Sequence, residues 1–118
     1  MKNRCFLESV KCAVRGAVQA FGRERNFRIY LLMMLITVPL NLWMRISLTQ
    51  WLLLFVCLCG AFSAECLNTA LEKLCDLVTQ EYSTAVGYIK DVAAGAILWW
   101  GIAYFGIELI LLGGRIFA

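Results

Sequence analysis

The chain has 118 residues, of which 62% are hydrophobic and 16% are charged, with a net charge of +3. Soluble domains average roughly 45–50% apolar and about 25% charged residues, so this composition indicates a membrane protein. It excludes a soluble enzyme, a disordered regulator and a disulfide-stapled secreted module. The length predicts one domain, residues 1–118. Histidine is absent, so acid–base chemistry has to rest on carboxylates, lysine or cysteine.

The N-terminal residues 1–28 predict an amphipathic helix that lies in the headgroup layer of a membrane. Apolar and polar side chains separate onto two faces at helical spacing, and the polar face is basic. No apolar core or small-residue cleavage site of a signal peptide precedes Phe27. A helix that only packs on a transmembrane bundle is the alternative. The apolar positions are Phe6, Val10, Ala13, Val14, Ala17 and Phe21.

Three apolar stretches predict three transmembrane helices, at about residues 29–44, 46–72 and 91–114. The first has 16 uncharged residues, somewhat fewer than the ~20 that cross a hydrocarbon layer, so flanking residues must help to span it. Arg45 alone separates the first two stretches, which predicts an antiparallel hairpin with a short turn from Met44 to Ser47. A longer polar link, roughly residues 73–91, precedes the third. The predicted fold class is therefore an all-α membrane protein.

Lysine and arginine residues indicate how these helices are oriented. Nine of them precede the first stretch or lie in the second link, whereas only Arg45 and Arg115 lie at the opposite ends. Positive residues are retained on the cytoplasmic side of a membrane. The N-terminus and the second link are therefore predicted to face the cytoplasm.

Acidic residues at the end of the second apolar stretch form a polar stripe. At about 100° per residue, Glu65, Glu72 and Asp76 lie within about 20° of one line and Asn68 about 60° from it. Such charge beside a membrane is costly, and glutamates seven residues apart repel one another unless a cation or proton intervenes. A divalent cation that prefers oxygen ligands, such as Mg²⁺, could bind to this stripe, and Glu24 could supply a second carboxylate. The alternative is a salt-bridged helix cap that uses Arg23, Arg25, Lys73 or Lys90.

The link after this stripe carries Glu81 and ends in Lys90 and Asp91. A lysine beside an acid at the start of a helix can hold a polyphosphate while the acid positions metal or ribose. No glycine-rich phosphate loop is present, which excludes a soluble-kinase fold.

The six cysteines are interpreted as small packing residues. No two have Cys-x-x-Cys spacing, three lie in an apolar run, and no histidine is available to activate a thiol. We expect Cys57, Cys59 and Cys66 to be dispensable for chemistry. The six cysteines are Cys5, Cys12, Cys57, Cys59, Cys66 and Cys75.

Over nearly its whole length the chain resembles the prokaryotic diacylglycerol kinase family of integral membrane lipid kinases. The order and spacing of several short motifs carry this resemblance. They are Arg15-Gly16, Glu24-Arg25-Asn26-Phe27, Glu65-x-x-Asn68-Thr69-Ala70-Leu71-Glu72 with Asp76, Glu81, and Lys90-Asp91-x-x-Ala94-Gly95-Ala96.

The resemblance implies a homotrimer in a bacterial cytoplasmic membrane, with active sites shared between protomers and facing the cytoplasm. It implies phosphorylation of a membrane lipid alcohol with ATP and Mg²⁺, and no nucleic acid partner. Glu65 would be the general base and Asn68 would position the reacting groups. Glu24 and Glu72 would bind the metal on the ATP phosphates, and the remaining nucleotide contacts would come from Glu81, Lys90 and Asp91.

Physical reasoning from the residues agrees with these roles. Glu65 lies at the depth of a lipid hydroxyl, whereas Glu72 lies farther out, toward water-borne ATP. The flanking residues resemble the undecaprenol kinase branch of the family, with diacylglycerol as the alternative substrate. A small oligomeric transporter is a remote alternative, because the centres of the three spans are uncharged and the polar groups gather at one interface. Small residues on the second and third spans suit close helix contacts between protomers.

Overall fold

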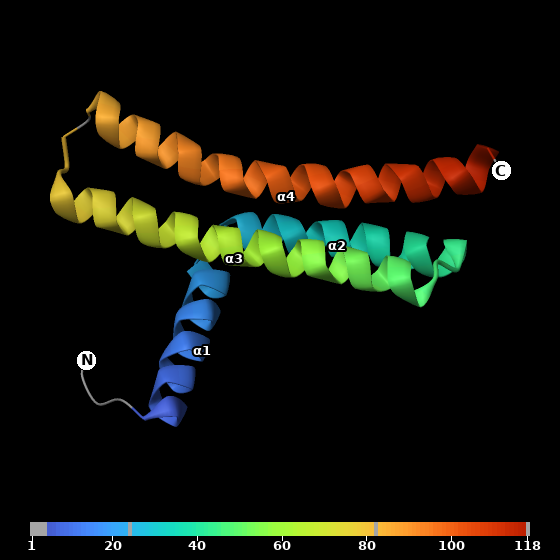
Figure 1. Cartoon of the computed structure of the whole chain (residues 1–118), viewed down its shortest axis with the longest axis horizontal. Coiled ribbons are helices and arrows are strands. Elements are labelled where there is room, and N and C mark those ends of the chain that lie inside the picture. Colours follow the sequence, from blue (N-terminus) through green and yellow to red (C-terminus); the bar gives the residue numbers. More distant parts are fainter. Residues whose placement is uncertain (1–4, 24, 82, 118) are drawn as a thin grey trace.

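The computed structural model describes residues 5–23, 25–81 and 83–117, which fold into four helices (Figure 1). They are α1 (Phe6–Arg23), α2 (Arg25–Met44), α3 (Leu48–Val78) and α4 (Thr84–Phe117). In Figure 1, α2, α3 and α4 lie alongside one another, whereas α1 extends away from this bundle. No strand occurs within the described ranges.

Three helices are long and apolar enough to cross a membrane: Asn26–Met44, Leu48–Val78 and Thr84–Phe117. The prediction of an all-helical protein with three such helices is therefore confirmed. With 31 and 34 residues, α3 and α4 extend beyond the predicted spans and measure about 46 and 51 Å, longer than a hydrocarbon layer of ~30 Å. Leucines between the acidic residues maintain the helical period of α3, so most of the polar link is helical.

Capping hydrogen bonds define both the end of α3 and the start of α4. The backbone N–H of Thr79 donates to the Cys75 carbonyl at 3.0 Å, which closes α3. The Ser83 hydroxyl accepts a hydrogen bond from the Val86 N–H at 3.1 Å, which opens α4. Only residues 79–83 lie between the two helices.

The predicted turn between the first two spans is present. Ser47 caps α3, because its hydroxyl accepts from the Gln50 N–H at 3.2 Å while the Gln50 side chain accepts from the Ser47 N–H at 2.8 Å. This reciprocal pair is a capping box. Arg45 occupies the left-handed region, with φ of 53°. Pro39 lies inside α2, and a proline within a helix can produce a kink or a frayed helix end.

Two polar contacts between α2 and α4 lie one helical turn apart. The hydroxyls of Thr37 and Tyr104 are 2.6 Å apart, and the Asn41 amide donates to Glu108 at 2.8 Å. All four side chains are buried. Both pairs are separated by 67 residues, so the two helices run side by side in a fixed register. Glu108, an acidic residue within an otherwise apolar part of α4, therefore has a defined partner.

The predicted N-terminal helix ends at Arg23, and α2 begins at Arg25, earlier than the expected start of the first span. Phe21 of α1 packs near Phe27 and Phe62, with ring centroids 5.3 and 6.3 Å away. Most other apolar side chains of α1 are exposed. They include Phe6, Leu7, Val10, Val14 and Val18.

The core between α3 and α4 depends on close approach at one glycine. Leu54 and Cys57 of α3 pack on Tyr104 of α4, and Trp100 borders this cluster. A β-carbon at Gly60 would overlap the Trp100 indole, so the two helices fit together only with glycine at this position.

We expect Gly60→Ala to destabilise the folded protein by about 1–3 kcal/mol through overpacking. Thermal unfolding in detergent would measure the effect as a lower Tm. Gly106→Ala is the matched control, because a β-carbon there meets nothing within 4 Å. Equal Tm values for the two variants would contradict the proposed contact.

Candidate active site

Glu65 of α3 is a fully buried carboxylate, with 0% of the residue exposed. Two α2 side chains bind one of its oxygens. The Asn26 amide donates to Glu65 Oε1 at 2.9 Å, and the Tyr30 hydroxyl donates to the same atom at 3.4 Å. A buried charge needs hydrogen-bonding partners, and α2 supplies them across the helix interface.

An aromatic cluster holds these two donors in place. Phe27 follows Asn26 on α2, one helical turn before Tyr30, and is only 2% exposed. Its ring centroid is 5.2 Å from that of Phe62 on α3, and the Tyr30 ring is 5.5 Å from Phe62. Such packing restricts the rotamers of α2 side chains, so the orientation of Glu65 is fixed by a rigid surface.

A cavity of about 200 Å³ lies beside Glu65. Asn26 and Tyr30 form its polar side, and Ile29 of α2 and Ile97 of α4 form its apolar side. Ile29 is 47% exposed, so this side of the cavity faces the surroundings of the apolar helices. The cavity therefore borders Glu65 on an apolar side, although the carboxylate itself has no exposed surface.

The next members of the stripe, Asn68 and Glu72, contact each other. The Asn68 amide donates to Glu72 Oε1 at 3.1 Å. Asn68 is buried and Glu72 half-buried. Among the described residues, Asn68 Oδ1 and the buried Thr69 hydroxyl have no hydrogen-bond partner. This part of α3 therefore carries a carboxylate, an amide oxygen and a hydroxyl, which are oxygen ligands of the kind that hard cations prefer.

The last acid of the stripe is paired with the following helix. Lys90 of α4 lies 3.3 Å from Asp76, and both side chains are partly exposed. The salt-bridge alternative therefore holds for Asp76, although an exposed pair of this kind contributes little to stability. Asp91 and Glu81 are exposed, and the Glu81 N–H donates to the Thr79 hydroxyl at 3.1 Å.

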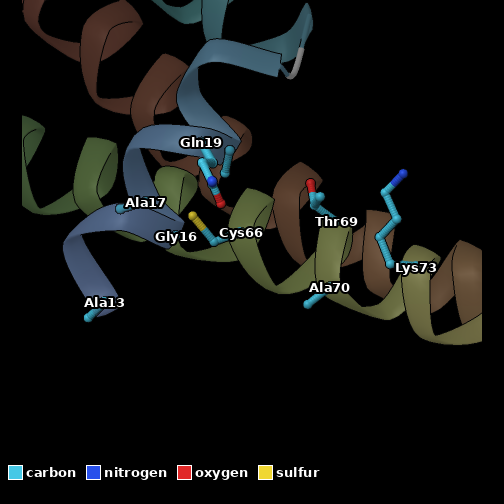
Figure 2. Close-up of a pocket in the computed structure, with 9 residues that line it drawn as sticks. Ala13, Gly16, Ala17, Gln19, Cys66, Thr69, Ala70 and Lys73 are labelled. Atoms are coloured by element: carbon cyan, nitrogen blue, oxygen red, sulfur yellow. The ribbon is translucent and has the colours of Figure 1, made fainter. Parts of the chain in front are cut away.

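A larger pocket of about 650 Å³ lies between α1 and α3 (Figure 2). Small residues of α1, including Gly16 and Ala17, form one wall. Thr69 and Lys73 of α3 border the other, and Figure 2 shows Gln19 reaching toward Cys66. On α3 the lining runs from Cys66, which follows Glu65 in the chain, to Lys73, so the pocket places a lysine beside the oxygen-rich segment of α3.

The structure thus brings Glu65, Asn68 and Glu72 onto one helix and places Lys90 beside the outer end of their stripe. Glu24 lies outside the described residues. Within the described ranges, no cluster of three or more histidine, cysteine or acidic residues forms a metal site. No disulfide joins the six cysteines, all of which lie within the described ranges, and Cys57 and Cys75 are buried.

Sequence analysis did not assign roles to Asn26 and Tyr30, the partners of Glu65. Polar α2 positions 26, 30, 37 and 41 recur at intervals of four, seven and four residues, the spacing of one helix face. Each of these side chains contacts α3 or α4. That spacing in an otherwise apolar segment was the available signal.

Comparison with known proteins identifies the class to which this fold and site belong. Residues 11–112 match the family described as prokaryotic diacylglycerol kinase. The chain therefore belongs to that family, and it is a lipid kinase.

Two relatives illustrate the range of the family. An undecaprenol kinase of Bacillus subtilis (strain 168) is 33% identical over 92 residues, which cover 78% of this chain and 75% of the relative. A diacylglycerol kinase of Synechocystis sp. is 33% identical over 110 residues, which cover 92% of this chain and 60% of the relative. The chain thus spans less than two thirds of the length of the Synechocystis protein.

Removing the donors to Glu65 is expected to lower kinase turnover. Hydrogen bonds to charged groups contribute about 1.5–3 kcal/mol, so Asn26→Ala should reduce kcat by on the order of tenfold or more. Tyr30→Phe should cost less, because its bond of 3.4 Å is longer. Tyr88→Phe is the control, since Tyr88 is 71% exposed. Steady-state kinetics would measure these effects. A wild-type kcat for Asn26→Ala would refute the importance of the hydrogen bond from Asn26 to Glu65 for turnover.

Proposed function

We propose that this lipid kinase transfers the γ-phosphoryl group of ATP to the hydroxyl of undecaprenol. The observation that carries this proposal is the position of Glu65, which is fully buried yet lines a cavity with apolar walls. A membrane lipid alcohol can bring its hydroxyl to such a carboxylate without leaving an apolar environment. A water-soluble acceptor would have to give up its hydration to approach Glu65 past these apolar walls.

In the proposed reaction, Glu65 acts as the general base. The lipid oxygen attacks the γ-phosphorus, the bond from this phosphorus to the β–γ bridging oxygen breaks, and ADP leaves. Glu65 accepts the proton of the lipid hydroxyl. Asn26 and Tyr30 orient the carboxylate through Oε1. Positioning of this kind supplies much of the catalysis in phosphoryl transfer.

The nucleotide is proposed to bind farther along α3, toward the outer end of the stripe. Glu72, together with Glu24, would hold Mg²⁺, and the unpartnered Asn68 Oδ1 beside Glu72 is consistent with an oxygen-rich site. Mg²⁺ usually binds one or two protein carboxylates together with phosphate oxygens and water, and when bound it neutralises phosphate charge. Lys90, Asp91 and Glu81 would contact the nucleotide, with Asn68 positioning the reacting groups.

The lining of the cavity favours undecaprenol over diacylglycerol. Diacylglycerol carries two ester groups beside its hydroxyl, and their carbonyls accept hydrogen bonds. The Tyr30 hydroxyl and one N–H of Asn26 are bonded to Glu65, so only the second N–H of Asn26 is left for an ester carbonyl, and the remaining lining residues are isoleucines. A polyprenol has no ester groups to satisfy. Diacylglycerol is the second candidate, because the Synechocystis relative bears that name.

The membrane arrangement is proposed to follow the charge distribution, with the site facing the cytoplasm and α1 in the headgroup layer. Active sites would be shared within a homotrimer. In support, only 11% of the most apolar segment of α4 is buried within a single chain. Ala94 and Ala96 are exposed on α4 and would permit close approach by a neighbouring protomer.

Two substitutions separate the proposed roles. Glu65→Gln should retain nucleotide binding but lose turnover by on the order of 10² to 10⁴, the usual range for a general base. Glu72→Gln should lose metal-dependent nucleotide binding. Binding of a fluorescent ATP analogue with and without Mg²⁺, together with kcat, would measure both. Glu8→Gln, on the exposed surface of α1, is the control. Equal loss of binding in both site variants would contradict this division.

The choice of lipid is tested by measuring kcat/KM for undecaprenol and diacylglycerol in the same detergent. We expect a clear preference for undecaprenol. Ile97→Asn adds a donor to the cavity wall and should shift the ratio toward diacylglycerol, whereas Ile102→Asn, 53% exposed farther along α4, should not. A wild-type preference for diacylglycerol would overturn the proposed substrate.

A further inference from the structure

A second polar site lies at the end of the bundle opposite the kinase residues. The α2–α3 turn and the C-terminal end of α4 meet there (Figure 1). They enclose a pocket of about 310 Å³. Arg45 of the turn and Arg115 of α4 line it together with Gln50, and Ile46, Ile110 and Leu111 supply apolar walls. Gln50 and Glu65 are separated by 15 residues of α3, or roughly 22 Å.

Arg45 has an unusual backbone for an arginine. Its φ of 53° lies in the left-handed region, where glycine or asparagine is less costly. Hydrogen bonds of the turn hold this conformation: Arg45 N donates to the Leu42 carbonyl at 3.2 Å, and Ile46 N to the Asn41 carbonyl at 3.4 Å. The backbone conformation alone would favour glycine or asparagine here, so an arginine at this position points to a role for its side chain outside the turn.

The positive charge of this pocket is not compensated by nearby acids. Among the residues that the structure describes, no carboxylate forms an ion pair with Arg45 or Arg115. Glu108, the nearest acid along α4, is buried and bound by Asn41. The Arg115 guanidinium lies 5.2 Å from the centre of the Trp43 ring, a cation–π contact that does not neutralise its charge.

We infer that this pocket binds the phosphate headgroup of an anionic phospholipid. Two guanidinium groups from different elements can bind one phosphate through charge-assisted hydrogen bonds. The apolar walls continue into exposed residues such as Leu109 and Ile110, which suit acyl chains and not a free anion. Basic pockets between transmembrane helices bind lipid headgroups in this way. The site is separate from the kinase site and would anchor the hairpin turn to one leaflet.

The test compares retained lipid in native mass spectra of protein purified with phosphatidylglycerol or with phosphatidylcholine. The wild-type protein should retain phosphatidylglycerol, and Arg45→Gln/Arg115→Gln should lower its apparent affinity about tenfold or more, because two charge-assisted bonds are lost. Lys11→Gln/Arg28→Gln removes the same charge from the opposite end of the bundle, where α1 is proposed to lie in the headgroup layer, and should lower the apparent affinity less than the Arg45/Arg115 variant does. Kinase activity of the Arg45/Arg115 variant verifies that it is folded.

Three results would overturn the inference. The first is wild-type retention of phosphatidylglycerol by the active Arg45/Arg115 variant. The second is an equal loss in the Lys11/Arg28 control, which would indicate non-specific charge attraction. The third is displacement of the lipid by inorganic phosphate at millimolar concentration, which would indicate a site for a free anion.

Discussion

The structure depends on a carboxylate buried within an apolar helix bundle. Glu65 has no exposed surface, and an ionised group in such surroundings is tolerated only with hydrogen-bonding partners. Those partners lie on another helix, so α2 and α3 have to maintain their relative rotation for Glu65 to keep them. The same requirement that stabilises the charge therefore fixes the direction of the carboxylate in the cavity.

One face of α2 provides hydrogen-bonding partners for buried carboxyl and hydroxyl groups of the neighbouring helices along most of the bundle. Its first half provides Asn26 and Tyr30 to Glu65, and its second half provides Thr37 and Asn41 to α4. The apolar contact at Gly60 completes the arrangement by bringing α3 and α4 together. The helices are otherwise covered by exposed apolar side chains, which suit lipid or neighbouring copies. A few polar contacts thus fix how the helices meet, and two of them orient the Glu65 carboxylate.

The sequence was sufficient to predict what depends on composition and on the helical period. Three apolar helices, the turn at Arg45, and the shared face of Glu65, Asn68 and Glu72 all follow from those two properties. Contacts between helices do not, because residues 35 or 39 positions apart meet only when the helices adopt a particular rotation. Asn26 and Tyr30 were missed for this reason, as was the partner of Glu108. The continuation of α3 past the apolar stretch also follows from the helical period, because leucines alternate with the polar residues of the stripe, whereas the start of α4 at Thr84 lies before the expected third span.

Direct transfer of phosphate to a lipid hydroxyl at Glu65 is the central claim, and it is tested by one measurement. In a single turnover with γ-³²P-labelled ATP, Mg²⁺ and undecaprenol in nanodiscs, the label should pass to the lipid with no labelled protein at any time point. Cys66, the thiol nearest to Glu65 in the chain, should carry none. Label that accumulates on the protein before it reaches the lipid, or that never reaches undecaprenol, would contradict this account.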